Sequence, residues 1–222
     1  QTYNTITAYD QVNFKITQTS FTDDRKDGDV EKEEVKTYEV LSGITDYSDL
    51  LNTNGIIAVE NINVVLRSGS VTEKEQFNAK HEAKVVMTAN YKILDGNLEW
   101  ADKTLVTTVF NTSNINLVES TETVKYRFTT LKDGGDVDNY KDMNYEVYNS
   151  VISYAKVYDN SRKHILSETN DTYSRIEKNT VLTTEQMLLQ KVIEGTPLIL
   201  KTGEEIFNTG FTGRGNAIQK IT

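Results

Sequence analysis

Strict alternation of apolar and polar side chains marks the stretch Val124-Lys125-Tyr126-Arg127-Phe128-Thr129. A period of two places one set of side chains on each face of an extended chain, which is typical of a half-buried β-strand. Residues 9–17 show the same alternation, and further runs are rich in β-branched or aromatic residues. These runs cover residues 35–40, 56–65, 105–110, 145–157 and 198–200.

Turn signals separate several of these runs. The dipeptides Asp27-Gly28, Asn54-Gly55, Asp95-Gly96 and Asp133-Gly134 tolerate positive φ at low cost. Several of them lie between apolar runs, as hairpin turns do. We therefore predict a mainly β protein, at the margin of a β-rich α+β class.

Two segments depart from the strand pattern. Thr72-x-x-Glu75 matches a capping box and precedes good helix formers, so it predicts a helix over residues 76–84. Thr183 and Gln186 form a second capping box, followed by an apolar stretch that ends at Gly195. For residues 187–193 two interpretations stay open: a helix, or a hairpin in which residues 188–193 pair with residues 198–200.

Three segments of the first half return in the same order about a hundred residues later. The matches are Lys26-Asp27-Gly28-Asp29-Val30 with Lys132-Asp133-Gly134-Gly135-Asp136-Val137, Lys92-Ile93-Leu94-Asp95-Gly96-Asn97 with Lys191-Val192-Ile193-Glu194-Gly195-Thr196, and Val109-Phe110-Asn111-Thr112 with Ile206-Phe207-Asn208-Thr209. They predict two related β-sandwich or small-barrel units, residues 1–112 and 113–222, each with about one short helix. The second unit would be a divergent duplicate packed on the first. The alternative is that these are chance matches in a chain rich in Asp, Thr, Tyr and Val.

Composition excludes several classes of protein. Of the 222 residues, 37% are hydrophobic and 26% are charged, and the net charge is −9. An acidic chain without a basic patch disfavours nucleic acid and anionic membrane surfaces as partners. The sequence holds no run of apolar residues long enough for a membrane span. It also holds no cysteine, which excludes disulfides, thiolate nucleophiles and cysteine-ligated metals.

Carboxylates gather at two Asp-Gly turns, and hard oxygen ligands of this kind are what calcium prefers. Neither turn has the spacing of an EF-hand loop. The alternative is a solvated hairpin tip, in which Asp and Gly serve turn geometry alone. The candidate metal ligands are Asp27, Asp29, Glu31, Asp133, Asp136 and Asp138.

Motifs for catalysis are scarce. The two histidines, His81 and His164, are isolated in sequence, and no Gly-x-Ser-x-Gly motif occurs. Paired carboxylates could be drawn from 33 acidic residues, so their presence indicates nothing. The one tryptophan, Trp100, is expected to pack in a core or at an interface. We therefore expect no catalytic or cofactor-binding residue, no required cofactor, and no enzymatic activity.

These features predict a homo-oligomeric structural subunit of an extracellular, cell-surface or virion assembly, such as a filament, tube, fibre or shell. Residues 1–9 and 217–222 look extended and suited to adding a strand to the sheet edge of a neighbouring copy. The alternative is a calcium-dependent module that binds a glycan or a protein. A polysaccharide hydrolase is a third interpretation, which would need acidic residues clustered in a cleft.

Overall fold

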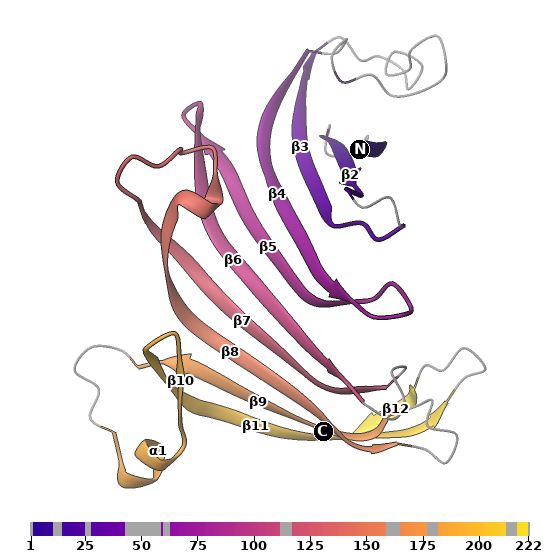
Figure 1. The fold of residues 1–222 in the computed structure, drawn as a ribbon, viewed down its shortest axis with the longest axis vertical. Helices are drawn as coiled ribbons and strands as arrows, with labels where there is room; N and C mark the ends of the chain where they lie inside the picture. Colours follow the sequence, from indigo (N-terminus) through magenta and orange to yellow (C-terminus); the bar gives the residue numbers. More distant parts are fainter. Residues whose placement is uncertain are drawn as a thin grey trace. The chain divides into compact units, whose positions relative to one another are not determined.

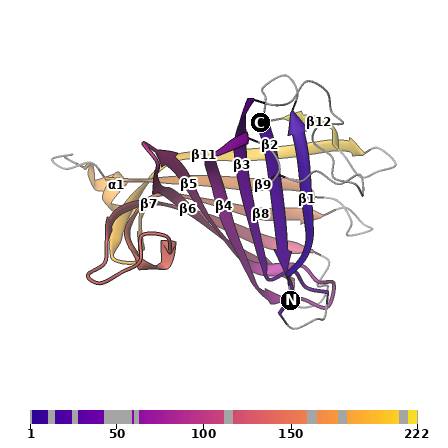
Figure 2. The ribbon, with the colours of Figure 1, turned by 90° about the horizontal axis from the view of Figure 1, so that it is seen from above.

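The computed structural model describes residues 2–10, 15–24, 28–42, 59, 63–111, 117–158, 165–176, 182–211 and 217–221. Within these ranges the chain is mainly β, as predicted, and 12 strands belong to one open antiparallel sheet (Figures 1 and 2). One short α-helix and the 3₁₀ helix η3 (Tyr140–Asp142) accompany them. The expected sandwich or barrel units are not confirmed.

Strands that follow one another in the chain are neighbours in most of the sheet. The strand order is β1-β2-β3-β4-β5-β6-β7-β8-β9-β11-β10, and β12 pairs with β11. The first six strands are β1 (Thr2–Asp10), β2 (Lys15–Thr22), β3 (Lys32–Ser42), β4 (Asn63–Phe77), β5 (Ala83–Leu94) and β6 (Asn97–Phe110). The remaining elements are β7 (Val118–Leu131), β8 (Met143–Tyr158), β9 (Ile165–Arg175), α1 (Thr184–Leu188), β10 (Gln190–Ile193), β11 (Thr196–Phe211) and β12 (Ala217–Ile221).

The alternating stretch at residues 124–129 forms part of β7, which confirms the predicted strand. Val124, Tyr126 and Phe128 are buried, with exposed fractions of 5%, 1% and 7%. Lys125 and Arg127 point to the other face and are exposed. The sequence period therefore gives both the extended conformation and the buried face of this strand.

The helix predicted over residues 76–84 is wrong. Strand β4 continues to Phe77, because Thr72 and Glu73 pair with β3. The hydroxyl of Thr72 forms a 2.9 Å hydrogen bond with the Thr88 hydroxyl instead of capping a helix. Asn78 then makes the turn, since its Oδ1 accepts hydrogen bonds from the backbone N–H groups of residues 80 and 82.

The second capping box is confirmed, and both interpretations of residues 187–193 are partly correct. The Gln186 N–H donates to Thr183 Oγ1 at 3.2 Å, and the Thr183 N–H donates to Gln186 Oε1 at 3.0 Å. Helix α1 nevertheless ends at Leu188, and residues 190–193 pair with β11 in a hairpin. In this hairpin the side chain of Ile193 is partly buried against the cluster that contains Tyr126 and Leu198.

One pair of repeated segments shares its local geometry. Asp95-Gly96 and Glu194-Gly195 both have positive φ at each residue, 51° and 83° in the first and 47° and 76° in the second. Both dipeptides form two-residue turns of type I′ between paired strands. The repeated acidic turns differ, because Asp29 is buried whereas Asp136 is exposed. Internal duplication therefore stays a prediction.

The chain forms two compact units, each made of three stretches. One consists of Gln1–Lys74, Met87–Asp102 and Thr130–Asn144, and the other of Glu75–Val86, Lys103–Thr129 and Tyr145–Thr222. Each unit has its own apolar cluster. Ile16 and Val59 lie at the centre of the first, and Tyr126 and Leu198 belong to the second. The boundary predicted after residue 112 lies outside the described residues, so the division into residues 1–112 and 113–222 stays a prediction.

The donation of the N-terminal strand to a neighbouring copy is contradicted. Strand β1 pairs with β2 of its own chain, with Tyr9 opposite Ile16 and Asp10 opposite Lys15. The described C-terminal strand behaves in the same way, since β12 pairs with β11. Pairing within the chain satisfies one edge of each terminal strand without a second copy.

Leu198 provides a test of the core in the second unit. The Leu198→Ala variant should lose about 2–5 kcal/mol of unfolding free energy, because its side chain is fully buried against Val124, Tyr126 and Val147. Leu188, with 82% of its surface exposed, is the matched control. Its replacement by alanine should change stability by no more than about 0.5 kcal/mol. Chemical denaturation would measure both, and equal losses would contradict this core.

Candidate functional site

The first acidic turn joins β2 to β3 and uses its carboxylates as acceptors for backbone donors. The Gly28 N–H donates to Asp23 Oδ2 at 3.0 Å, and the Asp24 N–H donates to Glu31 Oε2 at 2.9 Å. Asp23 and Asp29 are both buried, with 7% of their surface exposed. Of the predicted metal ligands, Asp27 lies outside the described residues. In these contacts the acidic side chains stabilise the turn, which is the role that the alternative to metal binding gives them.

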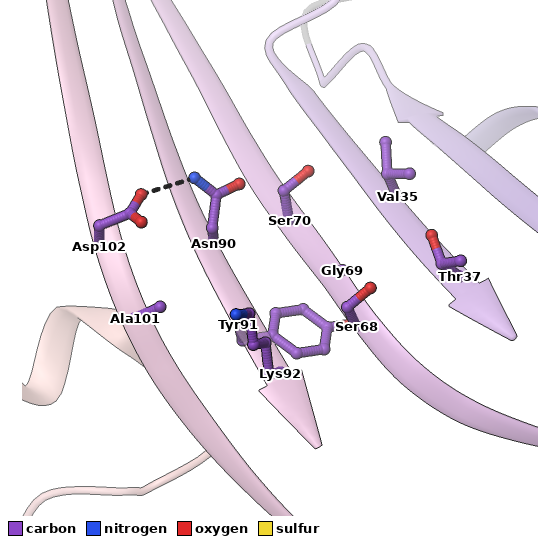
Figure 3. Close-up of a pocket in the computed structure, with 10 residues that line it drawn as sticks. All are labelled: Val35, Thr37, Ser68, Gly69, Ser70, Asn90, Tyr91, Lys92, Ala101 and Asp102. Carbon is purple, nitrogen blue, oxygen red and sulfur yellow. Dashed lines mark hydrogen bonds between the residues drawn. The ribbon is translucent and has the colours of Figure 1, made fainter. Parts of the chain in front are cut away.

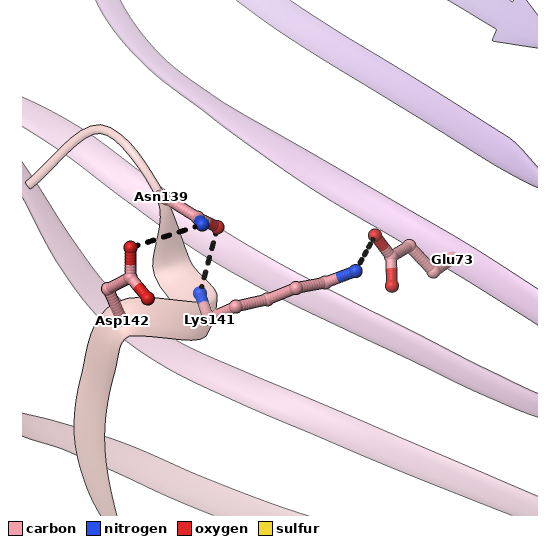
Figure 4. Close-up of polar contacts among 4 residues, drawn as sticks. All are labelled: Glu73, Asn139, Lys141 and Asp142. Atoms are coloured by element: carbon pink, nitrogen blue, oxygen red, sulfur yellow. Dashed lines mark hydrogen bonds and ion pairs between the residues drawn. The ribbon is translucent and has the colours of Figure 1, made fainter. Parts of the chain in front are cut away.

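The second acidic turn, between β7 and β8, is organised around Asp142. Its Oδ2 accepts hydrogen bonds from the Asp136 N–H at 3.1 Å and from Asn139 Nδ2 at 3.2 Å. Asn139 in turn caps η3 by accepting from the Lys141 N–H at 3.1 Å (Figure 4). Lys141 Nζ lies 2.7 Å from the carboxylate of Glu73 on β4, so the turn is anchored to the sheet.

The other two predicted ligands in this turn contribute little to its internal hydrogen bonding. Asp133 is exposed, and Asp138 is exposed with its backbone N–H donating to Asp136 Oδ1 at 3.0 Å. In the described part of the chain, no three His, Asp or Glu side chains lie close enough together to hold a metal ion. Calcium binding at the two turns stays a prediction.

Within the first unit, aromatic packing holds the β7–β8 turn against β5 and β6. The Trp100 ring packs edge-on against Tyr91 and Tyr140, with centroid distances of 5.1 and 5.5 Å. Its Nε1 donates a 2.9 Å hydrogen bond to the carbonyl of Val137 in the turn. Because only 8% of Trp100 is exposed, its expected place in a core is confirmed.

A groove of about 330 Å³ runs over β3, β4, β5 and β6 in the first unit. Figure 3 shows polar side chains from these four strands facing it, and Asn90 Nδ2 donates a 2.7 Å hydrogen bond to Asp102 Oδ1. The lining residues are mostly small or polar: Val35, Thr37, Ser68, Gly69, Ser70, Asn90, Tyr91, Lys92, Ala101 and Asp102. Strands set the backbone positions of these groups, so the groove is built on rigid elements.

Gly69 is required where Tyr91 crosses β4. A β-carbon at this position would collide with the Tyr91 hydroxyl and with the backbone carbonyl of Val35. The Tyr91 ring is only 4% exposed. Burial, with smaller effects from Glu34 and Tyr38, raises the pKa of Tyr91 to about 12. The hydroxyl therefore stays protonated well into the alkaline range.

In the second unit, a hydrogen bond and cation–π contacts surround the tip of the β10–β11 hairpin. Tyr126 on β7 donates a 3.2 Å hydrogen bond to Glu194 Oε1, and Lys103 Nζ lies 4.5 Å from the centre of the Tyr126 ring. The same ammonium lies 3.2 Å from the Tyr145 ring centre. Burial and the Glu194 carboxylate raise the pKa of Tyr126 above its usual value. The hairpin tip is thus tied to β7, although β8 and β9 lie between β7 and β11 in the strand order.

A second ionic contact lies on the same hairpin. Glu122 Oε1 accepts from Lys191 Nζ at 2.6 Å and from the fully buried Ser150 hydroxyl at 3.0 Å. His81 lies in the exposed β4–β5 turn with φ of 64°, and His164 lies outside the described residues.

Comparison with protein-family models, with curated proteins and with solved structures gives no significant match. In the part of the chain that the structure describes, no helix combines the length and apolar character needed to cross a membrane. A function for this chain is therefore inferred from its own surfaces.

Sequence reasoning missed the groove. Its residues are ordinary strand residues that come from four different strands, and none belongs to a compact motif. One local signal was present in Ser68-Gly69-Ser70, since a glycine flanked by small side chains inside a strand indicates close approach of another group.

Calcium binding can be tested on the second turn. If the carboxylates of Asp136 and Asp138 ligate the ion, calcium should raise the midpoint of thermal unfolding relative to chelator, because the bound ion stabilises the folded state. The double variant Asp136→Asn, Asp138→Asn should remove most of this difference. Identical midpoints with calcium and with chelator for the wild type would leave turn geometry as their only role.

Tyr91 should make the protein sensitive to alkali. Its folded-state pKa of about 12 lies above the ordinary value of 10.0, so its contribution to stability is complete below pH 10 and is lost as the pH rises toward 12. The Tyr91→Phe variant should therefore lose less stability than wild type between these limits, measured by denaturation at a series of pH values. Tyr154→Phe is the control, because this ring is 42% exposed. A Tyr91→Phe variant with the wild-type pH profile would contradict the assignment.

Proposed function

We propose that this chain is a non-enzymatic structural subunit of an extracellular or virion assembly, such as a filament, tube, fibre or shell. The observation that carries the proposal is the strand β10, which among the described strands has one unpaired backbone edge and lies next to a group of exposed apolar side chains. Soluble proteins usually protect such edges against pairing with another chain. We infer that the function of the β10 edge is to pair with another chain.

The backbone edge of β10 is open. Its inner edge pairs with β11, and in the described part of the chain no strand pairs with its outer edge. A lysine at an edge strand often blocks association, but Lys191 is directed toward Glu122 and forms an ion pair with it. Val192, on the opposite side of the strand, is 64% exposed.

Apolar side chains continue from β10 into α1. Met187, Leu188 and Leu189 are 51%, 82% and 46% exposed, and together with Val192 they form the α1–β10 patch. Four large apolar side chains within six consecutive residues are costly to leave in water. A contact that covers this patch would offset that cost.

The occupant that we propose is β10 of a second copy. An antiparallel pair centred on Val192 places this side chain opposite the partner's Val192, around a two-fold axis. In the same register Lys191 lies opposite the partner's Ile193, so like charges do not face each other. The contact is self-complementary, and it joins the α1–β10 patches of the two copies into one apolar surface.

A larger assembly needs a second contact, since a two-fold contact alone closes into a dimer. Strand β1 lies at the other end of the strand order and is paired only with β2 among the described strands. A second two-fold contact through β1 would extend the dimers into an open chain. This use of β1 keeps its pairing with β2, unlike the strand donation that the structure contradicts.

Substitution at Val192 tests the β10 contact. The Val192→Asp variant should weaken self-association about tenfold or more, because each two-fold contact would place two carboxylates opposite each other. Sedimentation velocity over a wide range of protein concentration measures the effect. Val137→Asp is the matched control, since this exposed valine lies in the β7–β8 turn of the other unit. A wild type that stays monomeric at high concentration would overturn the proposed function.

A further inference from the structure

We propose that the groove over β3, β4, β5 and β6 binds a carbohydrate, whose neighbouring hydroxyl groups are held by Asn90 and Asp102. This site is separate from the β10 edge and goes beyond the proposed structural function. All of its lining residues belong to the first unit, whereas β10 belongs to the second.

The residues that line the groove indicate the chemical class of the ligand. Hydroxyl groups of Thr37, Ser68 and Ser70 accompany one amide, one carboxylate and one ammonium group. The opposite charges of Lys92 and Asp102 balance, so the groove lacks the excess of cations that a phosphate or a nucleotide needs. A neutral ligand with many hydroxyl groups matches this mixture of donors and acceptors best.

Asn90 and Asp102 form the centre of the site. The amide of Asn90 donates to one Asp102 oxygen at 2.7 Å, which fixes both planar groups relative to each other (Figure 3). A carboxylate has about four acceptor positions, and the amide also has a carbonyl oxygen. Two adjacent hydroxyl groups of a sugar can therefore donate to the pair at the same time.

The shape of the groove also suits a sugar ring. The short side chain of Ala101 lines the groove, and the buried Tyr91 ring occupies the place where a side chain at Gly69 would lie. Val35 and the alkyl part of Lys92 supply apolar surface for the C–H groups of a ring. Since Tyr91 packs against Trp100, the floor is already ordered before a ligand binds, which lowers the entropic cost of binding.

Titration monitored by nuclear magnetic resonance tests the proposal. The ¹⁵N-labelled protein is titrated with neutral trisaccharides of glucose, of galactose and of mannose, and separately with inorganic phosphate. At least one trisaccharide should shift the side-chain amide signals of Asn90 and the backbone amides of residues 68–70. Inorganic phosphate should leave these signals unchanged, because the groove carries no net positive charge.

Two variants and one control make the assignment specific. Asp102→Ala should weaken binding of the trisaccharide about tenfold or more, because the ligand loses hydrogen bonds to a charged group. Ser70→Val, which a strand tolerates well, should abolish binding by filling the groove. Glu204→Ala removes an exposed carboxylate of β11 in the second unit, outside the groove, and should leave the affinity unchanged. Each variant is compared only if its amide spectrum is that of a folded protein.

The outcome is independent of the assembly proposal. The Val192→Asp variant should bind the trisaccharide as the wild type does, so loss of self-association does not affect this test. The carbohydrate proposal is overturned if none of the trisaccharides shifts the groove signals. It is equally overturned if phosphate shifts them as strongly, or if folded Asp102→Ala and Ser70→Val keep wild-type affinity.

Discussion

The structure depends on one constraint: a chain with few apolar residues must cover the faces of an antiparallel sheet. Hydrogen bonds between neighbouring strands satisfy the backbone, but they do not remove the sheet faces from water. With 37% hydrophobic residues, the chain can bury only limited parts of these faces. In each unit, a returning segment covers one such part. The turn with η3 packs over Trp100, and the β10–β11 hairpin packs over Tyr126.

Both returning segments are held by the same combination of an aromatic ring and a polar contact. Trp100 donates to a carbonyl of the turn, and Tyr126 donates to Glu194 at the hairpin tip. A buried aromatic residue of this kind supplies apolar area and also satisfies its own donor. The position of each ring along its strand therefore determines which loop can fold back and where it is anchored.

Residue patterns predicted much of the fold because strand periodicity is local. The alternation at residues 124–129 gave the correct conformation and the correct buried face. The capping box at Thr72 misled, since pairing with β3 decides the conformation there and is not visible in the local sequence. The groove could not be predicted for a similar reason. Asn90 and Asp102 are 12 residues apart, and only the pairing of β5 with β6 brings them together.

The two proposed surfaces follow from different parts of the sheet. An edge strand presents backbone groups whose pairing is almost independent of side chains, so affinity comes from the backbone and specificity from residues such as Val192. A sheet face presents only side chains, and a groove on it depends on which of them are small. Gly69 removes a side chain at the point where Tyr91 passes, and Ser68 and Ser70 stay short beside it. A meandering sheet can therefore keep an assembly contact at its edge and a ligand site on its face, and a substitution in one need not disturb the other.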